Sequence, residues 1–250
     1  MTSLLPIAES TTLRHLGPLD GSRLIVVVGR NNQARQSSVI ENILYDLHAE
    51  GHSVCWFDER PFSVLDLLNK EFTQLMGGRI SRLCARLKRY EKILRQLMKF
   101  ILLTRHPTLW VILWREVNDR RLFLVNSLDR FLCDLKSPQL YLLGHSAGGI
   151  VSSLIPNSNK VKKIACFGYP FKHPEHPDEP YRTKHLEEFA KPFLIFQGDN
   201  DAYGSAETSR QYKLSSNICV VSVRASHDYE DFSVDEYERC LTQLRAFFTN

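Results

Sequence analysis

The sequence predicts an α/β fold, in which a mostly parallel sheet carries helices on both faces. Short, continuous apolar runs recur along the chain, and segments with helical spacing of apolar residues lie between most of them. This alternation is typical of parallel strands joined by crossover helices, because both faces of such a sheet are buried. A length of 250 residues with 43% hydrophobic residues is enough for one domain with a full core, so we expect residues 1–250 to form a single domain.

The expected strands are the continuous apolar runs. The first central strand covers residues 23–28 (RLIVVV) and ends at Gly29, as a buried parallel strand does. The other strands expected are 53–57 (SVCWF), 140–143, 161–168 (VKKIACFG), 193–197 (FLIFQ) and 218–223 (ICVVSV). Because Cys55, Cys166 and Cys219 fall inside such runs, we expect them to be buried, reduced thiols.

Helical patterns separate these strands. Apolar residues repeat at helical spacing in 38–50, which Gly51 follows, in 119–135, and in a last helix that includes Phe247. The 82 residues from Asp58 to Gln139 are far more than a crossover between parallel strands requires. We therefore predict a helical insertion over residues 62–117, whose clearest helix covers 79–104.

A serine flanked by glycines follows the strand at 140–143. The stretch GHSAG, residues 144–148, matches the motif G-x-S-x-G, with an apolar run before it and helix-forming residues from Ile150 onward. In this motif the serine lies on a strained turn between strand and helix, where side chains at the glycine positions would collide with neighbouring backbone. The motif therefore predicts that Ser146 is a nucleophile.

Two later loops offer the partners that this serine requires. A serine hydroxyl needs a base to take its proton and a carboxylate to orient the base, and here the expected order is serine, acid, histidine. The loop GDND begins directly after FLIFQ, and His227 follows ICVVSV. The usual spacing G-x-x-D favours Asp201 as the acid, Asp199 is the alternative, and His227 is the predicted base.

The remaining requirement of acyl transfer is a pair of donors for the developing oxyanion. We expect the backbone N–H of Ala147, directly after the nucleophile, and that of Arg30 in the loop after the first central strand, with Asn31 as the next choice. No metal or organic cofactor is expected. The histidines of residues 171–186 fit no zinc spacing, and the loop at 29–38 lacks the frame of a phosphate-binding loop.

The elbow, acid and histidine, in this order, resemble the α/β-hydrolase superfamily over nearly the whole chain apart from the insertion. More narrowly, Tyr169-Pro170, the run Arg182–Leu186 and the loop QGDNDAYG at 197–204 are similar to the hydrolase branch of NSL complex subunit 3 and testis-expressed protein 30. That branch is related to dienelactone-hydrolase-like enzymes, so the resemblance implies an α/β-hydrolase fold. Two features depart from the branch: Ala147, where methionine often follows the serine, and the long basic insertion.

These observations together predict a serine hydrolase of carboxylesterase or thioesterase type. Its substrate would be an acyl ester or thioester of a small or medium acyl group. The alternative is a catalytically weak or inactive α/β-hydrolase-fold binding module that uses the basic insertion to hold a protein or membrane partner. The presence of all three triad residue types in order favours the enzyme.

The net charge of the chain is +4, but its distribution is uneven. Residues 79–105 contain nine basic residues and one acidic residue, a local charge of +8. Basic amphipathic helices often bind anionic surfaces, so we expect an anionic membrane surface, or second an acidic protein, as the partner of the Arg79–Arg105 helix, and no nucleic acid. We expect the apolar face of this helix to cover the active site as a lid. A cytoplasmic location is expected, because the sequence shows no signal-peptide pattern and no apolar run of about 18 residues.

Overall fold

A computed structural model describes residues 13–29, 38–57, 120–155, 159–230 and 232–249, with separate helical residues between 96 and 114. The chain divides into two compact units. One contains residues 1–11 and 60–124, and the other contains residues 12–59 and 125–250. The second unit holds the sheet and every residue of the candidate active site described below.

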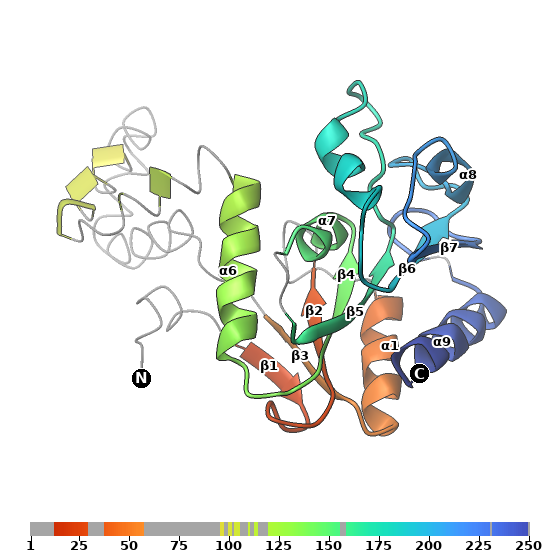
Figure 1. The fold of residues 1–250 in the computed structure, drawn as a ribbon, viewed down its shortest axis with the longest axis horizontal. Coiled ribbons are helices and arrows are strands. Elements are labelled where there is room, and N and C mark those ends of the chain that lie inside the picture. The colour runs from red at the N-terminus through yellow and green to blue at the C-terminus, as the bar shows by residue number, and fades with distance from the viewer. Residues whose placement is uncertain are drawn as a thin grey trace, which may run out of the picture. The chain divides into compact units, whose positions relative to one another are not determined.

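A seven-stranded sheet with the order β1-β3-β2-β4-β5-β6-β7 forms the centre of this unit (Figure 1). Its strands are β1 (Leu13–Leu16), β2 (Leu24–Val28), β3 (Ser53–Phe57), β4 (Leu140–His145), β5 (Val161–Phe167), β6 (Phe193–Gly198) and β7 (Ile218–Val223). All neighbouring pairs are parallel except β1 with β3, which is antiparallel. The mostly parallel α/β sheet predicted from the sequence is therefore present, and β1 is a strand that the sequence analysis did not identify.

The strand order reverses beside β2. From β2 the chain moves outward to β3, and it returns to β4 on the other side of β2. Sites in open parallel sheets form beyond the carboxyl ends of the strands at such a reversal. Val28 and Gly144 are register partners, so the loop after β2 and the turn after β4 begin side by side.

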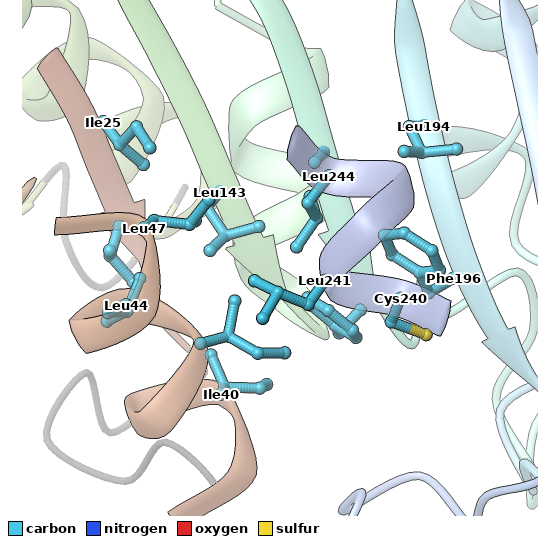
Figure 2. Close-up of a cluster of buried hydrophobic side chains, with 14 of the residues drawn as sticks. Ile25, Ile40, Leu44, Leu47, Leu143, Leu194, Phe196, Cys240, Leu241 and Leu244 are labelled. Carbon is cyan, nitrogen blue, oxygen red and sulfur yellow. The ribbon is translucent and has the colours of Figure 1, made fainter. Parts of the chain in front are cut away.

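Helices cover the sheet on both faces. Helices α1 (Ser38–Ala49) and α9 (Val234–Thr249) lie side by side, and their apolar residues pack against alternate residues of the strands (Figures 1 and 2). Figure 2 shows Leu44 and Leu47 of α1 and Leu241 and Leu244 of α9 in this cluster. The other residues of the central strands β2, β4 and β6 are also buried, and helix α7 (Ala147–Ser153) contacts β2, β4 and β5 on the opposite face. This double cover explains the continuous apolar runs.

One expectation about the thiols is wrong. Cys55 and Cys166 are buried, and burial raises the pKa of the Cys55 thiol to about 12, but Cys219 is exposed. The reason is the sheet order. β7 is the edge strand with one neighbour, and most of its residues are only partly covered.

Most of the predicted helix at 79–104, and most of the insertion at 62–117, lies outside the described residues. The residues described between 96 and 105 are helical, and the Thr104 hydroxyl donates a hydrogen bond to the Ile101 carbonyl (2.7 Å). The predicted helix at 119–135 corresponds to α6 (Arg120–Asp134). Among the residues that the structure describes, no helix is both long and apolar enough to cross a membrane. The lid and the cytoplasmic location stay predictions.

Candidate active site

The turn between β4 and α7 holds Ser146 in an unusual backbone conformation. Its φ of 54° and ψ of −123° lie outside the regions that residues with a side chain prefer. The Ser146 N–H donates to the carbonyl of Phe167 on the adjacent strand (2.9 Å), and the Ser146 carbonyl accepts from the Gly149 N–H (2.8 Å). Bonds on both sides of the residue therefore hold the strained turn in place.

The two glycines of the motif are required by close backbone approaches. A Cβ at Gly148 would lie 1.8 Å from the carbonyl oxygen of Val28, and one at Gly144 would lie 2.8 Å from the nitrogen of Gly149. Both distances are below 3.0 Å, which real Cβ contacts do not reach. The collisions with neighbouring backbone that the motif implies are present at both positions.

The structure brings Ser146, His227 and Asp201 together in one hydrogen-bonded chain. Ser146 Oγ lies 2.8 Å from His227 Nε2, and His227 Nδ1 lies 2.9 and 2.8 Å from the two carboxylate oxygens of Asp201. Asp201 follows β6 and His227 follows β7, and all three residues are buried. Asp199 is exposed, so the geometry selects Asp201 as the carboxylate that contacts the imidazole. The catalytic roles of the three residues remain predictions.

Two residues to which the sequence analysis assigned no role hold the carboxylate of Asp201. The Gln197 side-chain amide donates to Asp201 Oδ2 (2.9 Å) and to the carbonyl of Gly204 (2.5 Å), and the Tyr203 N–H donates to Asp201 Oδ1 (2.8 Å). Gln197 is fully buried, and its Oε1 has no hydrogen-bond partner among the described residues. Both residues lie in the run QGDNDAYG, residues 197–204, and Gln197 is the one amide at the end of the otherwise apolar run FLIFQ.

The base and acid are also enclosed by residues whose backbone is left-handed. Gly168 has a φ of 61°, and a Cβ there would lie 3.3 Å from both Asp201 Oδ2 and His227 Nδ1. Tyr229 has a φ of 58°, is fully buried and donates its hydroxyl to the Phe196 carbonyl (2.8 Å). Burial, with the negative charge of Asp201 added, raises the pKa of Tyr229, so this hydroxyl stays protonated as a donor.

The expected oxyanion donors are only partly within the described residues. Ala147 is the first residue of α7, so its N–H has no acceptor within the helix and is available beside Ser146. Arg30 and Asn31 lie outside the described residues. Gly29, which precedes them, is buried at the end of β2, next to the turn that holds Ser146.

A second serine, Ser153, also contacts a histidine, but its hydrogen bonds do not activate it as a nucleophile. Ser153 Oγ lies 2.8 Å from His185 Nε2, but the Ser153 hydroxyl donates to the Ile150 carbonyl (2.9 Å). With its proton committed to that carbonyl, Ser153 accepts from the histidine and is not activated as a nucleophile. Among the described residues, no group of three or more His, Cys, Asp or Glu side chains could hold a metal ion.

The fold and this geometry define a class of protein: an α/β domain with serine, histidine and carboxylate at the carboxyl edge of a mostly parallel sheet. Residues 114–242, just over half of the chain, match the family described as an alpha/beta hydrolase domain. The chain therefore belongs to this family, and the resemblance to the α/β-hydrolase superfamily is confirmed. A search of curated proteins finds no match.

Solved structures share the fold at low sequence identity. An esterase from Exiguobacterium antarcticum matches with a TM-score of 0.56 and 12% identity over 96% of both chains. A monoacylglycerol lipase from Paleococcus ferrophilus matches with a TM-score of 0.57 and 12% identity over 96% of this chain and 98% of the lipase. A thioesterase domain from the curacin biosynthetic pathway matches with a TM-score of 0.54 and 11% identity over 94% of both chains. At these identities the likeness establishes the fold.

Proposed function

We propose that this member of the alpha/beta hydrolase family is a serine hydrolase of carboxylesterase or thioesterase type, acting through Ser146, His227 and Asp201. The observation that carries the proposal is the continuous contact from Ser146 Oγ through the imidazole to the carboxylate, at 2.8 Å and 2.8–2.9 Å. The left-handed turn at Ser146 supports it, because backbone strain of this kind is concentrated at functional sites. The esterase, lipase and thioesterase folds are compatible with it.

The proposed reaction follows from the positions of the protons. His227 Nε2 takes the proton of Ser146 as its Oγ bonds to the acyl carbon, and Asp201 keeps the Nδ1–H in place. The backbone N–H of Ala147, and that of Arg30, would hold the oxyanion. The imidazolium then gives its proton to the departing alcohol or thiol. Water, deprotonated by the same imidazole, cleaves the acyl-enzyme to the carboxylic acid and restores Ser146.

The test compares two buried serines that each contact a histidine. Wild type and the control Ser153→Ala should be labelled by a fluorophosphonate probe and should hydrolyse p-nitrophenyl acetate, whereas Ser146→Ala should do neither while keeping its melting temperature. Alanine removes only the hydroxyl and leaves the backbone bonds of the turn. Labelling of Ser146→Ala at the wild-type rate would exclude Ser146 as the nucleophile. A wild type that neither reacts with the probe nor hydrolyses acyl esters and thioesters would favour the binding module.

We also propose that the chain belongs to the branch of NSL complex subunit 3 and testis-expressed protein 30. The motif residues that carry this resemblance contact one another. The Tyr169 hydroxyl donates to the Arg182 carbonyl (2.5 Å), Arg182 donates to the Pro170 carbonyl (3.4 Å), and His185 contacts Ser153 on α7. The motif therefore has a physical role in this chain, which is to fix the segment after β5 against the helix that begins at the nucleophile.

For the insertion, we propose an anionic membrane surface as the partner. The charge of +8 over residues 79–105 supports this, as do Leu97 and Phe100, which are helical and exposed. Co-sedimentation with phosphatidylserine-containing vesicles should decrease with salt. Changing Arg82, Arg86 and Arg89 to glutamate should abolish binding and spare hydrolysis of a small ester. A wild type that ignores these vesicles at low salt would contradict the proposal, and binding to an acidic protein would be the alternative to test.

A further inference from the structure

The ring of Tyr203 lies against the imidazole of His227. The two ring centroids are 4.4 Å apart and the planes are inclined by 35°, so the rings are tilted and closer to parallel than to perpendicular. The same residue donates its backbone N–H to Asp201 Oδ1 (2.8 Å). Tyr203 therefore touches both the predicted base and the predicted acid, one through its side chain and the other through its backbone.

Tyr203 is held in this position from its other side. The ring of His173 meets that of Tyr203 edge to face, with centroids 5.7 Å apart and planes at 85°. The Lys172 N–H donates to the Tyr203 carbonyl (3.0 Å), and the Glu175 N–H donates to His173 Nδ1 (3.1 Å). The segment after β5 thus braces the Tyr203 ring, although the residue is only half-buried.

We propose that Tyr203 is a positioning residue, whose ring fixes the plane of the His227 imidazole and stabilises the imidazolium that forms when Ser146 loses its proton. The proposal rests on the proposed hydrolase function. The face of an aromatic ring carries partial negative charge and attracts a cation within about 6 Å of its centroid. The centroid distance of 4.4 Å places the new positive charge within this range, whereas the neutral imidazole gains only the weaker contact between two aromatic rings.

The other groups that face the imidazole are unchanged when the Tyr203 side chain is replaced. Among the residues that the structure describes, the titratable ones are the carboxylate of Asp201 and the ring of His145, whose centroid is 6.1 Å from that of His227. The backbone bond from residue 203 to Asp201 does not depend on its side chain. Variants at this position therefore isolate the effect of the ring.

Two variants separate the ring from the hydroxyl. Tyr203→Phe keeps the aromatic face, and we expect kcat for p-nitrophenyl acetate to stay near the wild-type value. Tyr203→Leu keeps an apolar side chain without π electrons. Its kcat should fall about 2- to 30-fold, the range that corresponds to loss of a cation–π contact, with little change in KM. Its acidic limb of kcat/KM should also move to lower pH, because the protonated imidazole loses the same contact. Equal kcat and pH profiles for the two variants would overturn the proposal.

An NMR titration of the His227 ring requires no catalytic turnover. It therefore tests the role of Tyr203 independently of the proposed hydrolase function. The His227 ring signal can be identified by NMR as the histidine resonance missing from His227→Gln, and then titrated in Tyr203→Phe and Tyr203→Leu. The midpoint for Tyr203→Leu should be lower than for Tyr203→Phe. This shift in a protein that hydrolyses neither acyl esters nor thioesters would refute the hydrolase function and retain the ring's effect on the imidazole. Identical midpoints in an active enzyme would overturn the role of Tyr203 and retain the hydrolase.

Discussion

The substitution Asp201→Asn tests the site most sharply, because three donors converge on this carboxylate. Oδ1 accepts from the Tyr203 N–H and Oδ2 accepts from the Gln197 amide, at 2.8 and 2.9 Å. Both oxygens are also within 2.9 Å of His227 Nδ1. Asparagine keeps one oxygen and replaces the other with an NH₂ group that cannot accept. In either orientation of the asparagine side chain, its NH₂ group faces the Tyr203 N–H or the Gln197 amide, and both of these are donors.

The expected magnitudes follow from this mismatch. An amide nitrogen facing His227 Nδ1 favours the tautomer with its proton on Nε2, which cannot take the proton of Ser146. The equivalent change in another triad lowers kcat about 10⁴-fold, so we expect a loss of about 10³- to 10⁴-fold here. The donor left without an acceptor is buried, so the free energy of unfolding should also fall by about 1–3 kcal/mol.

Hydrolysis of p-nitrophenyl acetate gives kcat, and urea denaturation gives the free energy of unfolding. The matched control is Asp199→Asn, two positions away and exposed, which should change the unfolding free energy by no more than about 0.5 kcal/mol and leave kcat near wild type. The reasoning is refuted if Asp201→Asn retains kcat within about tenfold of wild type, or if Asp199→Asn loses as much.

Three further outcomes are expected. Gln197→Leu removes a buried donor to the acid and should lower kcat about 5- to 100-fold, and an unchanged kcat would show that this bond is dispensable. Gly148→Ala forces a Cβ to within 1.8 Å of backbone and should lower the free energy of unfolding by about 3 kcal/mol or more, whereas Gly51→Ala, with open space but a φ of 96°, should lower it by about 1–2 kcal/mol. Burial, with the charge of Arg23 added, lowers the pKa of His52 below its ordinary value of 6.5. The unfolded chain then binds more protons, so stability should fall as the pH drops below 6.5, and His52→Gln should flatten this slope in urea titrations at several pH values.

The parts of the site that could be predicted from the sequence are local patterns. The turn at Ser146 is specified by its two glycines and by the strand before it, and His227 was identified by its position after the last strand. The choice between Asp201 and Asp199 could not be settled by pattern, because both belong to one polar loop. The contact with the imidazole distinguishes them, and it depends on how far that loop extends beyond β6.

The supporting residues could not be predicted, because their roles arise from contacts between separate loops. The role proposed for Tyr203 depends on a ring contact with His227, which belongs to a different loop. Gly168 has a positive φ, and a Cβ there would contact Asp201 and His227 from two other loops. The strand β1 was missed since LRHL is short and mixes polar with apolar residues, which an antiparallel edge strand tolerates. The exposure of Cys219 likewise depends on strand order, because an apolar run does not indicate whether its strand lies at the centre or at the edge of the sheet.

The residues that form the contacts between Ser146, His227 and Asp201 lie in one part of the chain, and this affects how the protein can change during evolution. Ser146, Asp201 and His227, and the side chains of Gln197 and Tyr203 that touch them, all come from one contiguous part of the chain after β3 and α6. The unit with residues 60–124 precedes that part and contributes none of these five. A change in the length or charge of residues 62–117 therefore alters none of the five residues that make these contacts. Under the proposed function, residues that determine the binding partner and residues that determine the reaction would be encoded in separate stretches of the gene, so that selection could change one set without the other.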